Sequence, residues 1–216
     1  RPDEFEKFIE LLLADAPSDY TPWLFRVEEG SKAPATEFGS WKSQRAKLSP
    51  EQAVQWMERG GNVGVAGRPD DALINVDIDD EDETTPDDLK PTLMARSRSR
   101  TGVHAWYFEA PTGKEIPNIP TDDAGEVRTN WQYVVAPGSY VPVEDESSLP
   151  ADQQDDAGYY TVSRTDPVTS LRYDELPRVF TERDASTGEP DVNEDEMPSL
   201  EDLRDNDGSQ ATGDRQ

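Results

Sequence analysis

The spacing of apolar residues along the chain predicts two amphipathic helices and a series of short strands. Apolar side chains recur every three or four positions in residues 3–14 and 53–57, which places them on one face of a helix. The sequence Ser49-Pro50-Glu51-Gln52 has the form of a capping box, which marks the start of the second helix. A further short helix is expected at 89–95. The expected strands cover residues 20–27, 62–67, 72–79, 96–108, 126–128, 132–136 and 159–162.

The strand with the sequence ALINVDID is the one around which we expect the chain to be organised. Because successive strand side chains point to opposite faces, Ile74, Val76 and Ile78 share one face. Asp77 and Asp79 share the other face, roughly 6.6 Å apart along the backbone. Two carboxylates at the end of a rigid strand can bind Mg²⁺ or Mn²⁺ and leave coordination positions open for phosphate oxygens. The simpler alternative is a solvated acidic surface, which arises by chance in so acidic a chain.

The expected strand at 96–108 places the single histidine of the chain among arginines. Period-two spacing places on one face the residues Arg98, Arg100, Gly102, His104, Trp106 and Phe108. A histidine beside guanidinium groups is a candidate contact for a phosphate. Gly102 has no side chain and leaves room there for a bulky charged ligand. A half-buried structural histidine is the simpler alternative for His104.

Three other kinds of site are not supported by the sequence. An EF-hand loop beginning at Asp77 needs glycine at its sixth position and glutamate at its twelfth, where the chain has Asp82 and Asp88. One histidine and no cysteine do not make a usual zinc site, so no zinc is expected. A serine-type triad lacks the G-x-S-x-G motif that presents the nucleophile.

The excess of acidic over basic residues indicates the kind of protein and of surroundings to expect. The chain has 47 acidic and 21 basic residues, a net charge of −26 and five tryptophans. Together with the apolar periodicity, this suits a folded protein from a salt-rich cytoplasm, where salt screens the repulsion between carboxylates. A nucleic-acid partner then requires a locally basic site. No apolar run reaches the roughly 18 residues of a membrane span, so we expect a cytoplasmic protein without a membrane partner.

The composition changes near residue 181. From there the chain is acidic and nearly without large apolar residues, which is typical of disordered sequence. We therefore expect a single compact folded domain at 1–180 and an acidic disordered linker or tail at 181–216. The alternative is a chain that is disordered throughout, and the segments with apolar periodicity argue against it. Because the sequence starts at Arg1, we also expect it to be part of a longer protein.

The order of the motifs resembles that of a known family. The motifs are Lys32-Ala33-Pro34, Trp41, the GNVGVAG at 61–67, the VDID at 76–79, Gly102-Val103-His104, Glu126 and the YVVAPGS at 133–139. In this order they resemble the bifunctional primase-polymerase domain of the archaeo-eukaryotic primase superfamily, as found in archaeal plasmid and viral replication proteins. The resemblance runs from Lys32 to Ser139 and is expected to end at Leu176-Pro177.

The resemblance implies an α+β or α/β fold in which an RRM-like primase palm adjoins a small α/β lobe. It implies a DNA primase/DNA polymerase, a nucleotidyltransferase that adds nucleotides from NTPs or dNTPs to a 3′ hydroxyl in the DNA replication of a haloarchaeon, its plasmid or its virus. By motif position, Asp77, Asp79 and Glu126 are the catalytic carboxylates, expected to hold two Mg²⁺ or Mn²⁺ ions. The expected nucleotide-binding residues are His104, Arg100 and Gly102. Arg98 and Arg128 are the candidates for contact with nucleic acid.

The expected partners are a single-stranded DNA template with its primer, nucleoside triphosphates and a helicase module C-terminal to this chain.

Two departures from the family pattern keep a second function open. Glu126 stands where the family usually has aspartate, and the family's Ser-Gly-Gly-x-His segment is here Arg100-Thr101-Gly102-Val103-His104. The alternative is a catalytically silent module of a replication-initiation protein that binds nucleotide or nucleic acid. A third hypothesis is an acidic metal-binding or interaction protein without a nucleotide role.

Overall fold

The computed structural model describes residues 1–69, 71–79, 86–120, 124–143, 149, 151 and 153–187, and the side chains of 86 and 183–187 are not among the described parts. The chain divides into a unit of residues 1–186 and a unit of residues 187–216. The helices are α1 Pro2–Ala14, α2 Pro50–Met57 and α3 Arg178–Thr187, with 3₁₀ turns η1 Thr36–Phe38, η2 Pro86–Asp88, η4 Gln154–Asp156 and η5 Tyr173–Glu175. The strands are β1 Trp23–Val27, β2 Asn62–Ala66, β3 Leu73–Ile78, β4 Leu93–Arg96, β5 Val103–Glu109, β6 Gly125–Arg128, β7 Tyr133–Val135, β8 Thr161–Thr165 and β9 Ser170–Leu171.

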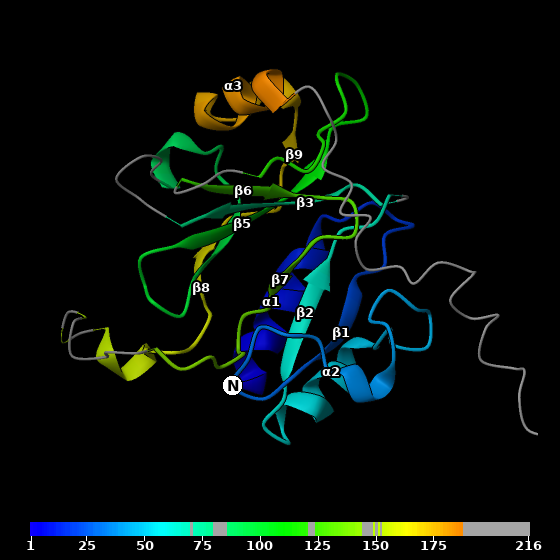
Figure 1. Cartoon of the computed structure of the whole chain (residues 1–216), viewed down its shortest axis with the longest axis vertical. Helices are drawn as coiled ribbons and strands as arrows, with labels where there is room; N and C mark the ends of the chain where they lie inside the picture. The colour runs from blue at the N-terminus through cyan, green and yellow to red at the C-terminus, as the bar shows by residue number, and fades with distance from the viewer. Residues whose placement is uncertain are drawn as a thin grey trace, which may run out of the picture. The chain divides into compact units, whose positions relative to one another are not determined.

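The strands form two sheets (Figure 1). The small sheet has the order β1-β2-β7 and is antiparallel. The large sheet has the order β6-β3-β5-β4-β8, also antiparallel, and β9 adds a short parallel pairing to β5. The expected mixture of helices and sheets in an α+β fold is confirmed, whereas the RRM-like character of the palm stays a prediction.

The main core lies between the two sheets and the first two helices. The apolar face of α1 buries Phe5, Phe8, Ile9 and Leu12, as its spacing predicts. The ring of Phe8 packs 4.7 Å from that of Trp106 on β5. Burial of each such side chain stabilises the fold by roughly 1.5–3 kcal/mol.

The predicted capping box at the start of α2 is confirmed. The backbone N–H of Gln52 donates to the Ser49 hydroxyl, and the Gln52 side chain accepts from the Ser49 backbone N–H at 2.9 Å. The two bonds satisfy donors that the first turn of a helix leaves without partners.

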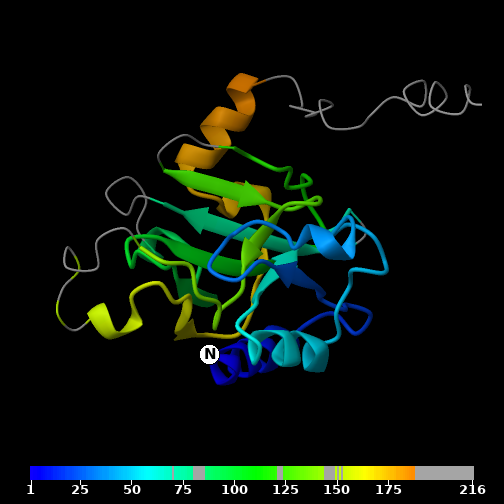
Figure 2. The same ribbon diagram turned by 60° about the horizontal axis from the view of Figure 1, so that its bottom comes forward.

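The opposite face of the large sheet has its own core. Ile74, Val76 and Ile78 of β3 point to this side, as the alternation predicts, and pack with side chains that include Phe180 of α3. Figure 2 shows α3 and α1 on opposite sides of the large sheet. Since β3 is buried on both faces, its polar side chains on the α1 side are held in an ordered environment.

Two expectations about the segment 89–108 are wrong. The expected helix at 89–95 is replaced by β4, which pairs with β5 and β8 and satisfies its backbone groups in the sheet. The expected strand at 96–108 is a hairpin, because a turn at 97–102 separates β4 from β5. The turn is closed by a 2.9 Å bond from the Ser97 N–H to the Gly102 carbonyl, and Arg100 has a φ of 63°. Arg98 and Arg100 therefore do not extend the strand face of His104.

Helix α3 continues past the domain boundary expected at residue 180, to Thr187. The rest of the expected linker or tail, residues 188–216, lies outside the described residues, as does the acidic segment 80–85 after β3. In the described part of the chain, no helix combines the length and the apolar composition that crossing a bilayer requires.

Candidate active site

The site is built around Asp77, near the end of β3. Its register partners are His104 on β5 and Glu126 on β6, so the three side chains stand side by side on one face of the large sheet. His104 Nε2 lies 3.2 Å from Asp77 Oδ1. Asp77 is 7% exposed and His104 5% exposed, so their contact is shielded from water. Asp79 follows the end of the strand and is exposed.

Arg128 connects two of the carboxylates. Its Nε lies 3.5 Å from Asp77 Oδ2, and its Nη2 lies 3.0 Å from Glu126 Oε2. Its Nη1 donates to the carbonyl of Tyr133 on β7 at 3.0 Å. In this arrangement Arg128 neutralises the acidic site and ties it to the small sheet, and its expected contact with nucleic acid stays a prediction.

The carboxylates differ in their tendency to ionise. Burial opposes ionisation of Asp77, but the charges of His104 and Arg128 outweigh it and lower its pKa. Burial raises the pKa of Glu126, with Arg128 acting in the opposite direction and Asp77 adding to the rise. Although Asp79 is exposed, partial desolvation of its carboxyl group and the neighbouring Asp77 raise its pKa. Burial therefore opposes the ionised forms of Asp79 and Glu126, and a cation bound beside them would favour those forms.

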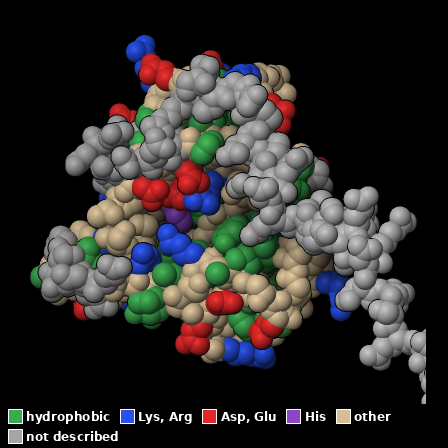
Figure 3. Space-filling model, viewed as in Figure 1, with side chains coloured by type: hydrophobic (Ala, Val, Ile, Leu, Met, Phe, Trp, Pro, Cys, Tyr) green, Lys and Arg blue, Asp and Glu red, His purple; other side chains and the backbone are tan. Residues whose placement is uncertain are grey.

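Lys32 is a residue of this site that sequence reasoning did not select. It lies in the loop after β1, is exposed, and lowers the pKa of all three carboxylates through its charge. The loop is anchored, because the Tyr133 hydroxyl donates to the Lys32 carbonyl at 3.0 Å and buried Asn62 donates to the Ser31 carbonyl at 3.0 Å. The only sequence signal was the Lys-x-Pro motif. Figure 3 shows acidic and basic side chains gathered around the histidine.

Other predicted site residues lie at the edge of this arrangement. Arg100 donates to the Thr161 hydroxyl at 2.9 Å and to Asp156 at 3.2 Å, which directs it toward β8. Arg98 donates to the carbonyl of Pro142. A Cβ at Gly102 would lie 2.6 Å from the carbonyl oxygen of Ile78, so the absence of a side chain there serves the close approach of the turn to β3. The roles of these three residues in nucleotide and nucleic-acid binding stay predictions.

The donor chemistry fits a hard divalent cation, because carboxylate oxygens are the ligands that Mg²⁺ and Mn²⁺ prefer. With the side chains as placed, no three acidic or histidine side chains among the described residues are grouped closely enough to hold an ion. Asp77 and Glu126 are instead occupied by Arg128. An ion bound by these carboxylates would take the place of that guanidinium. The buried Nδ1 of His104 also has no hydrogen-bond partner in the described part of the chain.

A cavity of about 280 Å³ lies elsewhere, lined in part by Glu28, Glu37 and Trp56. It includes none of the carboxylates of the site. The grouping of charged side chains on the large sheet, and not this cavity, therefore identifies the candidate active site.

A comparison with models of known protein families finds a match to this chain. The family model described as "Bifunctional DNA primase/polymerase, N-terminal" (Prim-Pol) matches residues 18–178, more than half of the chain. The chain belongs to this family. Membership in Prim-Pol implies DNA primase/polymerase activity in general terms, and therefore nucleotidyl transfer with DNA and nucleotides as substrates. A search of curated proteins finds no match. The primase-polymerase resemblance is thus confirmed at the level of the family.

Proposed function

We propose that this Prim-Pol chain is a metal-dependent polymerase domain that adds nucleotides from NTPs or dNTPs to a 3′ hydroxyl on a single-stranded DNA template. The observation that carries the proposal is the placement of Asp77 between His104 and Glu126, with Asp79 just beyond the strand end. In the proposal the large sheet is the RRM-like palm, and the small sheet with α1 and α2 is the adjoining lobe.

In the proposed reaction the primer 3′ hydroxyl loses its proton to water, and its oxygen forms a bond to the α-phosphorus. The bond between that phosphorus and the oxygen bridging to the β-phosphate breaks, and pyrophosphate leaves. Asp77, Asp79 and Glu126 would hold two Mg²⁺ or Mn²⁺ ions. The chemistry that such ions supply is activation of the hydroxyl and neutralisation of the phosphate charge. The repulsion from Asp77, which adds to the raised pKa values of Asp79 and Glu126, fits this assignment, because a bound cation offsets the repulsion between neighbouring carboxylates.

Two residues of the chain are suited to bind the triphosphate. Contact between Nε2 of His104 and Asp77 fixes the ring, and the unpartnered Nδ1 is left for a phosphate oxygen, to which it donates when the ring is protonated. Lys32 carries a compact positive charge beside all three carboxylates, where the phosphates would lie. Arg100 and Gly102 are further proposed nucleotide contacts, and Arg98 and Arg128 are proposed contacts with DNA.

The biological setting is also a proposal. The net charge of −26 supports a salt-rich cytoplasm, and therefore a haloarchaeon, its plasmid or its virus, as the source. A helicase module that follows this domain is the proposed protein partner.

The second candidate is a catalytically silent module that binds nucleotide or DNA. It is favoured by the contacts of Arg128 with Asp77 and Glu126, which fill the place that an ion needs. The two candidates differ in one outcome, since only the first transfers nucleotides.

The test is primer extension on a single-stranded template with Mg²⁺ or Mn²⁺, over KCl concentrations up to the molar range. The native chain is compared with Asp77→Asn/Asp79→Asn and with Asp3→Asn/Asp19→Asn, a control that removes two exposed acids elsewhere. We expect the native chain and the control to extend the primer. The Asp77→Asn/Asp79→Asn variant should not extend it, although it has the same helix content as the native chain. Binding of template without extension by a folded native chain would select the silent module.

A further inference from the structure

Partly buried aromatic side chains cover the outer face of the small sheet. Trp41, Trp131 and Tyr133 are partly exposed and pack on buried Trp23 and Phe25, and these five residues are called the aromatic cluster below. The ring of Trp41 stacks on that of Phe25 with centroids 4.6 Å apart and meets Tyr133 at 5.1 Å. The ring centroids of Trp41 and Trp131 are 6.1 Å apart. The cluster is separate from the main core, and its outer rings face solvent in part.

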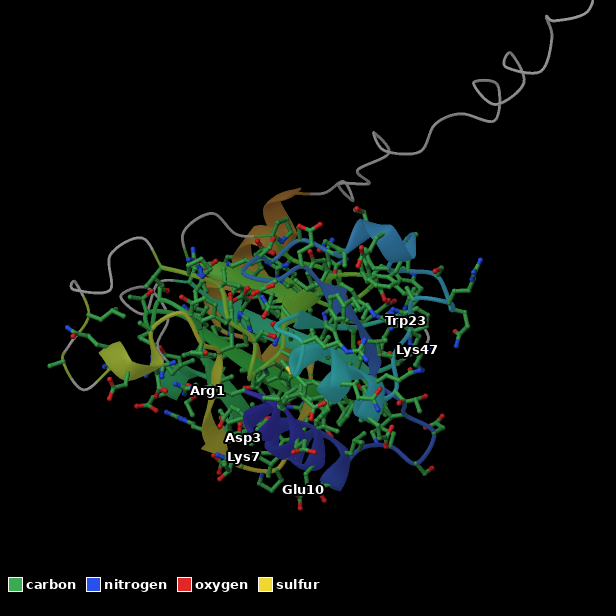
Figure 4. All side chains as sticks on the ribbon, turned by 90° about the horizontal axis from the view of Figure 1, so that it is seen from below. Arg1, Asp3, Lys7, Glu10, Trp23 and Lys47 are labelled. Carbon is green, nitrogen blue, oxygen red and sulfur yellow. The ribbon has the colours of Figure 1, made fainter. Side chains whose placement is uncertain are left out.

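Two lysine side chains lie beside rings of the aromatic cluster, although the chain is strongly acidic. Lys42 Nζ lies 5.3 Å from the ring of Trp41, and Lys47 Nζ lies 5.4 Å from the ring of Trp23. Figure 4 labels Trp23 and Lys47 next to each other. Between Glu37 and Glu51 the sequence has three basic residues and no acidic one, against 47 acidic and 21 basic residues in the whole chain. The local charge therefore suits an anionic partner.

The backbone holds Trp131 in an unfavourable conformation. Its φ is 54°, in the left-handed region that bulky residues avoid. Its N–H donates to the Gly67 carbonyl at 3.0 Å, and the Gly67 N–H donates to the Gln132 carbonyl at 3.2 Å. A Cβ at Gly67 would lie 2.5 Å from the Thr129 carbonyl oxygen, so only glycine permits this pairing. Conformations of this kind are concentrated at functional sites, where the surrounding structure enforces them.

The aromatic cluster adjoins the candidate active site through Tyr133. The carbonyl of Tyr133 accepts from Arg128, and its hydroxyl donates to the carbonyl of Lys32, each at 3.0 Å. A strand lying over the cluster would thus lead directly to the carboxylates.

We propose that the aromatic cluster binds single-stranded DNA and guides the template strand to the acidic site. Unpaired bases stack on the partly exposed rings of Trp41 and Trp131, and Lys42 and Lys47 contact the phosphates. Stacking of this kind needs the faces of unpaired bases and tolerates any sequence, as copying a template requires. The inference rests on the proposed function, since it names the surface that holds the substrate of that reaction.

The experiment is binding of a labelled oligo-dT strand to the full chain, measured by fluorescence anisotropy over a series of KCl concentrations. Trp131→Asn removes the indole and keeps a residue that tolerates positive φ, and Trp41→Leu removes the second ring. Each is expected to weaken binding by about tenfold. Phe38→Leu is the control, because Phe38 is exposed and contacts Trp56 outside the cluster.

The lysines are tested through the salt dependence of binding. When a protein no longer neutralises one phosphate of a single strand, the slope of log affinity against log salt becomes shallower by about 0.7. Lys42→Gln/Lys47→Gln is therefore expected to make the slope shallower by about 1.4. Lys7→Gln on α1, which Figure 4 labels apart from Lys47, is expected to leave the slope unchanged.

The outcomes separate this inference from the proposed function. If the folded variants bind oligo-dT and extend primers as the native chain does, the cluster is not the template site, and the proposed function stands. If the variants lose binding while the native chain binds oligo-dT but never extends a primer, the DNA-binding surface stands and the polymerase function fails. If Lys42→Gln/Lys47→Gln has the same salt slope as the native chain, these two lysines do not contact the phosphates.

Discussion

Asp77 and His104 face each other across β3 and β5, with 3.2 Å between Oδ1 of the aspartate and Nε2 of the histidine. Both side chains are buried, and the contact is the strongest favourable influence on the ionised form of Asp77. In the proposed site the histidine therefore keeps Asp77 charged, and its second nitrogen, Nδ1, is buried without a hydrogen-bond partner among the described residues.

Replacement of His104 by glutamine is expected to raise the pKa of Asp77. A carboxylate with a lowered pKa contributes stability above its unfolded value of about 3.9, and this contribution is lost as the pH falls through the folded value. His104→Gln should therefore show a smaller loss of stability below about pH 4, measured by thermal unfolding as a function of pH. Nucleotide incorporation should fall by about tenfold to a hundredfold, as expected when a charge-assisted hydrogen bond is removed. An unchanged acid profile would show that the pair does not hold Asp77 ionised.

Replacement of Glu126 by glutamine is expected to stabilise the fold at neutral pH while abolishing incorporation. Its raised pKa means that the folded state binds the proton more tightly, so its charge costs stability as the pH rises from the unfolded value through the folded value. The gain should be below about 1 kcal/mol, because 35% of the side chain is exposed and water screens it. Chemical denaturation at pH 7 and at pH 4 measures the effect, which should vanish at the lower pH. A destabilised variant at pH 7 would mean that the bond to Arg128 outweighs burial.

Replacement of Arg128 by alanine should destabilise the metal-free protein by about 1–3 kcal/mol, because Asp77 and Glu126 lose their shared cation. Since an ion at the same carboxylates supplies the missing charge, Mn²⁺ should restore more stability to this variant than to the native chain. Thermal unfolding with and without Mn²⁺ tests this. If Mn²⁺ raises the stability of the two proteins equally, the ion does not bind at the position that the Arg128 guanidinium occupies.

Replacement of Lys32 by alanine is expected to raise the KM for the nucleotide by about tenfold, because a charged group that binds the phosphates is removed. Stability should change by less than about 0.5 kcal/mol, since the side chain is exposed. Steady-state kinetics with varied nucleotide measures the effect, with exposed Lys7→Ala as the matched control. A fall in kcat at unchanged KM would assign Lys32 to a step after substrate binding.

The sequence predicted the parts of the site that depend on local alternation. The apolar face of β3 follows from period-two spacing, although the strand ends at Ile78 and Asp79 lies beyond it. The capping box at Ser49 follows from four adjacent residues. The hairpin at 97–102 was missed because alternating arginine and serine residues look like a strand, whereas the closing bond between Ser97 and Gly102 forms only in the turn.

Contacts between distant segments were beyond such reasoning. The charge of Lys32 acts on the carboxylates because its loop is held in place by Asn62 and Tyr133. These two residues lie 31 and 101 residues further along the chain than the loop carbonyls they bind. Arg128 was selected as a nucleic-acid contact, yet its partners are decided by the pairing of β6 with β3. Neither relation leaves a spacing signal in the sequence.

The central claim is that the carboxylates around Asp77 hold divalent cations, and Mn²⁺ titration followed by electron paramagnetic resonance tests it most directly. In molar KCl, which screens the acidic surface, the native chain and Asp3→Asn/Asp19→Asn should take up Mn²⁺ at saturable sites. Asp77→Asn/Asp79→Asn should lose this uptake while remaining folded. Equal uptake by all three proteins would contradict the assignment of the metal site and with it the proposed mechanism.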